Sequence, residues 1–300
     1  MGMKLSGITY NPSLGFGQNA WDQSVSITLI VTIVVGLSII YLYRWLNKNE
    51  LTRPKDTERI KRSKTKSSFG IWNSLVYVAR SPYLFYLVVI VVSYNLVYNL
   101  TETVVIKQIE IRFTEKNEFT SYMSRMTITQ GVMATFMAIF LTGPVISRFG
   151  WMIASLVTPV LIFITSGLFF GLINFGDSSY ALWAAGALGI SLPALTIWIG
   201  ATQNCLTRAS KYTFFDATKE LSFIPLDFAS QRKGKAAIDG IASRIGKSGG
   251  SAIYQVLLLF CSGINATIPF VSTSVIILIG CWIFAVFRLD TEMKKVATKK

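Results

Sequence analysis

The chain has 300 residues, of which 52% are hydrophobic and 15% are charged, against about 25% charged in a typical soluble domain. This composition is typical of an integral membrane protein. A net charge of +14, from 29 Lys and Arg against 15 Asp and Glu, would indicate a nucleic-acid partner only in a soluble protein. The sequence holds no His, which excludes His-ligated metals, Ser-His or Cys-His catalysis and His proton relays.

Uncharged runs predict the membrane spans, because a helix needs about 20 apolar residues to cross a bilayer. The 40-residue uncharged run between Lys247 and Arg288 is long enough for two spans, with 262-SGINATIP-269 as the break between them. We therefore expect an all-α integral membrane protein with seven transmembrane helices, at about 25–44, 82–102, 122–143, 151–173, 181–204, 241–261 and 269–287.

The distribution of basic residues predicts the orientation. If the segments 44–80, 144–150 and 204–247 and the C-terminal tail share one side, that side holds 24 of the 29 Lys and Arg. Positive charges favour the cytoplasmic side, so the N-terminus is expected outside and the C-terminus inside. The expected organisation is listed here: an external loop (1–24), a transmembrane helix (25–44), a basic cytoplasmic linker (45–80), a six-helix unit (81–290) and a basic cytoplasmic tail (291–300).

The first residues raise a further expectation. Residues 1–24 lack the 7–15-residue apolar core of a signal peptide. They have the character of an external loop that joins two spans, so we expect the chain to be the later part of a longer protein. The alternative is a complete seven-helix protein with a short external tail.

Two regions hold charges close to the predicted spans. Glu102 ends the second span, where it either faces a polar cavity with a basic partner or is simply solvated. The stretch 211–239 carries five basic and four acidic residues. Helical spacing there places Asp216, Lys219 and Glu220 on one face of a helix. The same spacing predicts an ion pair between Lys235 and Asp239.

The segment 240-GIASRIGKSGGSAI-253 combines Arg244 and Lys247 with small residues. Bidentate guanidinium groups of Arg, ammonium groups of Lys and exposed backbone N–H groups can all donate hydrogen bonds to the oxygens of a polyphosphate. A P-loop is excluded, since five residues separate Gly240 from Gly246 where the motif needs four, and no strand precedes it. The remaining alternative is a positive cytoplasmic loop with internal salt bridges.

The runs 211-KYTFFDATKELSFIPLD-227 and 233-KGKAAIDGIASRIGKSGGS-251 closely resemble the ATP:ADP antiporter family of intracellular bacteria and plastids. The resemblance continues through 43-YRWLNKN-49, 157-VTPVLIFITSGLFFG-171 and 282-WIFAV-286. It implies the later seven spans of a twelve-helix, major-facilitator-like transporter in a bacterial inner membrane. It also implies exchange of ATP for ADP, with no enzymatic activity and no cofactor.

The family's motifs suggest particular site residues. The functional Lys of the Lys-Tyr-Ser-Leu-Phe-Asp motif falls on Lys211, and the functional Glu of Asn-Leu-x-Glu falls on Glu102. The expected substrate-binding residues are Lys211, Arg244, Lys247, Lys219 and Glu102. Glu102 is expected to balance the basic cavity or to pair with Lys211 when no nucleotide is bound. The sequence departs from the family at 213-TF-214 and at Phe223, where Ser-Leu and Tyr are usual.

Other functions remain open. A proton-coupled importer of another nucleotide or NAD is the first alternative, and a non-transporting fragment that needs its N-terminal half as a partner is the second. A retinal protein is disfavoured because the span 269–287 has no Lys for a Schiff base. An ATP-hydrolysing pump is disfavoured because there is no P-loop. Nothing specific supports a receptor.

Overall fold

The computed structural model of the chain describes residues 17, 20–49, 71–176, 178–261 and 263–298. Most of the predicted loop 1–24 and residues 50–70 of the predicted basic linker lie outside the described residues. The helices of the described part, in chain order, are α2 (Ala20–Asn49), α4 (Ile71–Arg80), α5 (Pro82–Arg112), α6 (Lys116–Phe140), α7 (Thr142–Asn174), α8 (Ser179–Ala187), α9 (Leu192–Ser210), η2 (Lys211–Phe215), α10 (Asp216–Leu221), α11 (Phe228–Ala237), η3 (Ile238–Ala242), α12 (Ser243–Phe260) and α13 (Ile264–Thr298).

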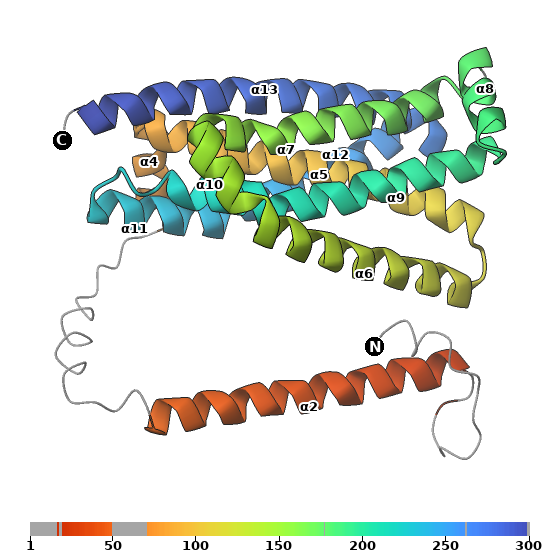
Figure 1. Cartoon of the computed structure of the whole chain (residues 1–300), viewed down its shortest axis with the longest axis horizontal. Coiled ribbons are helices and arrows are strands. Elements are labelled where there is room, and N and C mark those ends of the chain that lie inside the picture. The colour runs from red at the N-terminus through yellow and green to blue at the C-terminus, as the bar shows by residue number, and fades with distance from the viewer. Residues whose placement is uncertain (1–16, 18–19, 50–70, 177, 262, 299–300) are drawn as a thin grey trace. The chain divides into compact units, whose positions relative to one another are not determined.

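The chain divides into two compact units, 1–69 with 115–125, and 70–114 with 126–300. The first unit contains α2, a helix of 30 residues whose apolar side chains are exposed along most of its length. The second unit contains the remaining helices, apart from the first part of α6. In it α5 packs against α9, α12 and α13, and α7 packs against α9 and α13, as the parallel ribbons of Figure 1 show.

The N-terminus of α5 shows how the sequence fixes the start of a helix. Ser81 is extended, and its hydroxyl accepts a hydrogen bond from the Leu84 backbone N–H at 3.5 Å. Pro82 follows in the first turn, where its missing N–H is not needed and its fixed φ suits the helix. The predicted start of the span at residue 82 is therefore confirmed.

The core of the second unit centres on three aromatic side chains from different helices. Tyr94 of α5 lies 4.5 Å from Phe215 of η2 and 5.7 Å from Trp282 of α13, measured between ring centroids. Phe215 and Trp282 meet edge to face at 5.7 Å. Aromatic pairs in such geometries add stabilisation beyond the area that they bury. This cluster joins the residues after α9 to α5 and α13.

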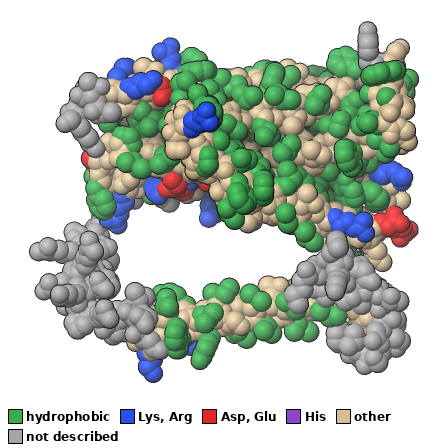
Figure 2. Space-filling model, in the orientation of Figure 1, with side chains coloured by type: hydrophobic (Ala, Val, Ile, Leu, Met, Phe, Trp, Pro, Cys, Tyr) green, Lys and Arg blue, Asp and Glu red, His purple; other side chains and the backbone are tan. Residues whose placement is uncertain are grey.

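Large apolar side chains cover much of the outside of the second unit. Trp183 is 75% exposed, Leu259 83% and Phe260 84%. Figure 2 shows hydrophobic side chains spread over the visible face of the helices, with the charged side chains concentrated towards their ends. Soluble proteins rarely expose continuous apolar patches of this extent, whereas lipid-facing helices do.

The structure supports part of the predicted span count. Four helices of the described residues are long and apolar enough to cross a membrane, within α2, α5, α7 and α13. A fifth span results if α8 and the helix from Leu192 to Leu221, which meet at 88°, are counted as one broken span. The helices α6 and α12 do not meet this criterion, so the count of seven spans is not confirmed.

Several predicted boundaries are wrong. The predicted loop 144–150 is helical up to Gly150, whose φ of 77° breaks α7 at that point. The predicted span 181–204 is interrupted between Ala187 and Leu192. The break before the last span is shorter than 262–269, since α13 begins at Ile264 and accommodates Pro269. Residues of the predicted tail up to Thr298 are helical and continue α13, where Lys294 and Lys295 pair with Asp290 and Glu292, and the cytoplasmic tail itself stays a prediction.

Close packing of α12 on α5 depends on glycines. A Cβ atom at Gly246 would lie 2.6 Å from the Asn95 Cβ and 3.1 Å from the Val92 carbonyl oxygen. A Cβ atom at Gly250 would lie 2.8 Å from the Asn99 Cβ. Small residues let membrane helices approach closely, so these two glycines serve helix packing.

We therefore expect Gly246→Ala to destabilise the protein by about 1–3 kcal/mol, because α12 must shift away from α5. Gly240→Ala is the matched control, since a Cβ atom there meets nothing within 4 Å. Thermal unfolding of the purified proteins in detergent measures both. Equal melting temperatures for the two variants would contradict the packing role of Gly246.

Candidate functional site

Four charged side chains lie on α5 and on the continuous helical segment from α9 to α10. We call Glu102, Arg208, Lys211 and Asp216 the charged cluster. Their side chains are between 19% and 37% exposed. Ionisable groups inside membrane helices are rare and usually pair or face a polar cavity, so the cluster is the first candidate for a substrate site.

The first pair of the cluster connects two helices. The Arg208 guanidinium on α9 donates through Nη2 to the Glu102 carboxylate on α5 at 2.7 Å. The Tyr98 hydroxyl donates to the same carboxylate oxygen at 2.5 Å, and Arg208 Nε donates to the Tyr98 hydroxyl. The guanidinium also lies 5.4 Å from the centre of the Tyr98 ring. Glu102 is therefore a paired carboxylate with a basic partner, and not a solvated helix end.

The second pair lies within one continuous helical segment. The Lys211 ammonium contacts the Asp216 carboxylate at 3.1 Å and lies 4.4 Å from the centre of the Tyr212 ring. Lys211 opens the π-helix η2, and Asp216 follows it directly. In a π-helix the backbone carbonyl of residue i accepts a hydrogen bond from the N–H of residue i+5. Residues five apart, such as Lys211 and Asp216, therefore lie one above the other, as residues four apart do in an α-helix.

The expected partner of Glu102 is therefore different in the structure. Glu102 was expected either to balance the basic cavity or to pair with Lys211. In the structure Lys211 pairs with Asp216, and Arg208 pairs with Glu102. The sequence does not indicate Arg208 as a site residue, because Arg208 falls in the segment 204–247 that the distribution of charges assigns to the cytoplasmic side. Its position near the end of the apolar helix α9, three residues before Lys211, is the signal that identifies it.

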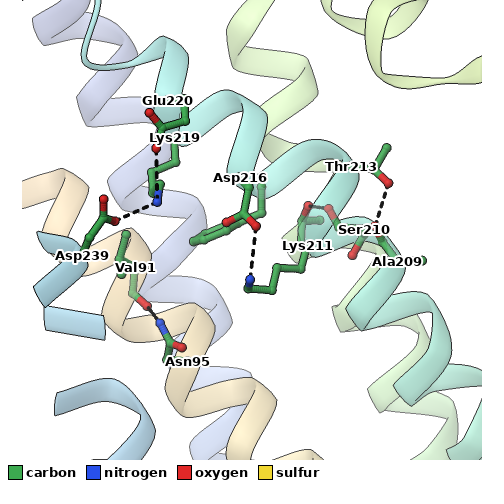
Figure 3. Close-up of polar contacts among 12 residues, drawn as sticks. Val91, Asn95, Ala209, Ser210, Lys211, Thr213, Asp216, Lys219, Glu220 and Asp239 are labelled. Carbon is green, nitrogen blue, oxygen red and sulfur yellow. Dashed lines mark hydrogen bonds and ion pairs between the residues drawn. The ribbon is translucent and has the colours of Figure 1, made fainter. Parts of the chain in front are cut away.

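Lys219 lies in a separate ion-pair network on α10, α11 and η3. Its ammonium contacts Asp239 at 2.8 Å and Glu220 at 3.5 Å, and Figure 3 shows it placed between these two carboxylates. Lys235 pairs with Glu220. The predicted pair between Lys235 and Asp239 is wrong, because each residue finds its partner on α10 instead of one turn along its own helix. The same figure shows Lys211 extending towards Asp216 on the neighbouring turns.

Arg244 and Lys247 lie in the first two turns of α12, and both are exposed. Within the described part of the chain, no hydrogen bond or ion pair connects either side chain to the charged cluster. Gly246 between them faces α5. The segment around Gly240 and Gly246 is helical, which agrees with the exclusion of a P-loop.

The part of the chain that the structure describes contains no group of three or more Cys, Asp or Glu side chains placed to hold a metal ion. Cys205 is buried, Cys261 is partly buried and Cys281 is exposed.

We expect Arg208→Gln to destabilise the protein by about 2 kcal/mol, because it leaves the Glu102 carboxylate without a cation. This value lies between those of exposed and buried ion pairs. Lys107→Gln is the control, since Lys107 pairs with Glu110 at the same 2.7 Å but in solvent, and its loss should cost less than about 1 kcal/mol. Double-mutant cycles of both pairs, measured by thermal unfolding, provide the comparison. Equal coupling energies would contradict a special role for the Glu102–Arg208 pair.

Comparison with known proteins gives a family match over almost the whole chain. The model of the TLC ATP/ADP transporter family matches residues 3–293. ADP,ATP carrier protein 1 of Chlamydia muridarum is 37% identical over 280 residues, which are 93% of this chain and 53% of that protein. No solved structure matches the chain.

Further relatives come from plants and other bacteria. The chloroplastic ADP,ATP carrier protein 1 of Arabidopsis thaliana is 32% identical over 96% of this chain and 45% of its own length. ADP,ATP carrier protein 1 of Rickettsia prowazekii is 35% identical over 90% of this chain and 55% of its own length. The chain thus spans about half the length of the curated relatives it matches. By its match to the family and its apolar helices, it is an integral membrane protein that belongs to the TLC ATP/ADP transporter family.

Proposed function

We propose that this chain takes part in the exchange of ATP for ADP across a membrane, as the later part of a twelve-helix transporter. The relatives are named ADP,ATP carriers, which makes these nucleotides the first choice of substrate. The observation that carries the proposal is the pair of partly buried cations, Arg208 and Lys211, at the end of an otherwise uncharged helix. Cations in such a place suit an anionic substrate.

The proposed site includes the residues that the motifs identify. Lys211 is the main phosphate-binding residue, and Glu102 balances the positive charge of the site. Arg244 and Lys247 are exposed donors at the start of α12 that approach the substrate from a neighbouring helix. Lys219 contributes less, since Asp239 and Glu220 already hold its ammonium.

The proposed mechanism is alternating access. Transporters of this architecture bind their substrate near the bilayer midplane, between two halves of the protein that rock against each other. In this scheme the loaded carrier reorients readily and the empty carrier reorients slowly. Entry of one nucleotide is thereby coupled to exit of another, and no hydrolysis step is needed.

The proposed topology follows the basic residues. We place the N-terminus outside and the C-terminus in the cytoplasm of a bacterial inner membrane. Of the 24 Lys and Arg that the sequence assigns to the cytoplasmic side, Arg208 and Lys211 lie within the membrane in this proposal. In this topology the seven spans are the four helices that meet the length and apolarity criterion, the broken span of α8 and Leu192–Leu221, and the helices α6 and α12. The lower hydropathy of α6 and α12 suits helices that face a polar path.

Uptake of labelled ATP tests the function. Cells express the full chain alone, or together with the part of the Chlamydia muridarum carrier that the chain does not match. ADP loaded beforehand should accelerate ATP entry if the protein is an exchanger. Uptake that ignores internal ADP and is abolished by a protonophore would indicate a proton-coupled importer instead. Absence of uptake in both forms, with the protein inserted, would contradict transport.

Lys211→Gln should reduce this exchange at least 10-fold while membrane insertion stays intact, because the substrate loses its main cation. The control is Lys295→Gln on α13, whose exposed ammonium pairs with Glu292 near the C-terminus. Both variants lose one positive charge, so only the position differs. Unchanged uptake in Lys211→Gln would remove Lys211 from the site.

A further inference from the structure

The charged cluster consists of two similar units, whose cations Arg208 and Lys211 lie three residues apart on one continuous helical segment. In each unit a cation contacts one carboxylate and one tyrosine ring. In the first unit Arg208 contacts Glu102 and Tyr98. In the second unit Lys211 contacts Asp216 and lies over the ring of Tyr212. The two cations are three residues apart, which places them on one helical face about 5–6 Å from each other at Cβ.

The charges of the two units cancel, with two cations and two carboxylates. The four side chains also remain partly accessible, from 19% for Glu102 to 37% for Arg208. Both cations therefore keep part of their surface accessible in this chain.

Phosphate groups compete with carboxylates for the same donors. A guanidinium fork and an ammonium group bind phosphate oxygens as readily as carboxylate oxygens. A polyphosphate brings several negative charges in one molecule, so it can replace both carboxylates at once. A group with a single phosphate replaces only one of them.

We propose that Arg208 and Lys211 together bind two neighbouring phosphates of the substrate, and that Glu102 and Asp216 hold these cations until the polyphosphate displaces them. The identity of the substrate as a nucleoside di- or triphosphate rests on the proposed function. The assignment of Arg208 as a phosphate-binding residue rests on the geometry of the cluster.

The two displacements have different structural consequences. Asp216 belongs to the same helical segment as Lys211, so its release changes little outside that segment. Glu102 lies on α5, so its release removes the ion pair that ties α5 to α9. Substrate binding at Arg208 therefore loosens a contact between two helices, and Glu102 acts as a positioning residue that couples occupancy to helix movement.

Lys219 does not take part in this exchange of partners. Two carboxylates, Asp239 and Glu220, lie within 3.5 Å of its ammonium, and its side chain is only 14% exposed. An anion would have to displace both of them from a less accessible position. The network around Lys219 therefore stays intact when the charged cluster is occupied.

Binding of inorganic pyrophosphate to the purified full chain in detergent, at low salt, tests this proposal without requiring transport. Glu102→Gln and Asp216→Asn should each bind pyrophosphate about 10-fold more tightly than the unmodified protein, because a competing anion is removed. Arg208→Gln and Lys211→Gln should each bind it about 10-fold more weakly. Orthophosphate should bind more weakly than pyrophosphate in every case.

Matched controls separate this effect from net charge and from folding. Glu110→Gln, on the same helix as Glu102, removes an equal charge from the exposed pair with Lys107, and should leave pyrophosphate affinity unchanged. Asp290→Asn is the corresponding control for Asp216, since Asp290 pairs with Lys294 on α13. Glu102→Asp keeps the negative charge and should restore the affinity of the unmodified protein.

The outcomes are distinct. Equal or weaker pyrophosphate binding in both Glu102→Gln and Asp216→Asn overturns the proposal, as does unchanged binding in Arg208→Gln. The proposal is also overturned if pyrophosphate binds neither to the unmodified protein nor to Glu102→Gln or Asp216→Asn. The expected binding pattern without ATP uptake would support the phosphate site and overturn the transport function alone.

Discussion

The structure depends on the pairing of charges within membrane helices. An unpaired Glu or Arg at membrane depth is costly, so each must meet an opposite charge or a polar cavity. Here the pairing of Glu102 with Arg208 joins α5 to α9, and Tyr98 satisfies both partners at once. This single contact explains how an apolar bundle can hold an acid and a base between two of its helices, and it brings the candidate site onto α5 and α9.

The two π-helical segments shape the surroundings of this site. The segment η2 follows α9 without a break and brings Lys211 to Asp216, while it directs Phe215 into the aromatic core with Tyr94 and Trp282. The segment η3 lies between α11 and α12 and carries Asp239, which pairs with Lys219 on α10. Such wide turns often mark functional sites in helices, because the extra residue in the turn changes which side chains share a face.

Features of the fold could be predicted from the sequence where residues close together in the chain determine the local structure. Ser81 and Pro82 specify the start of α5, and the helical surroundings of Gly240 and Gly246 exclude a P-loop. The pair between Lys235 and Asp239 was wrong because i,i+4 spacing was applied across a segment that is not α-helical throughout and whose partners lie on another helix. The interruption before Leu192 and the continuation of α13 through Pro269 also escaped prediction, since apolar runs carry little information about where a helix bends.

The sequence by itself determined the class of the protein, because composition, uncharged runs and the two long motifs depend only on the order of residues. It also identified Lys211 and Glu102 as candidates. Only the tertiary structure decided which acid meets which base. Glu102 and Arg208 are 106 residues apart, and no spacing rule connects them. Their contact exists because α5 and α9 pack side by side, and packing depends on the combined shapes of all the helices, including the close approach of α12 to α5 that Gly246 and Gly250 allow.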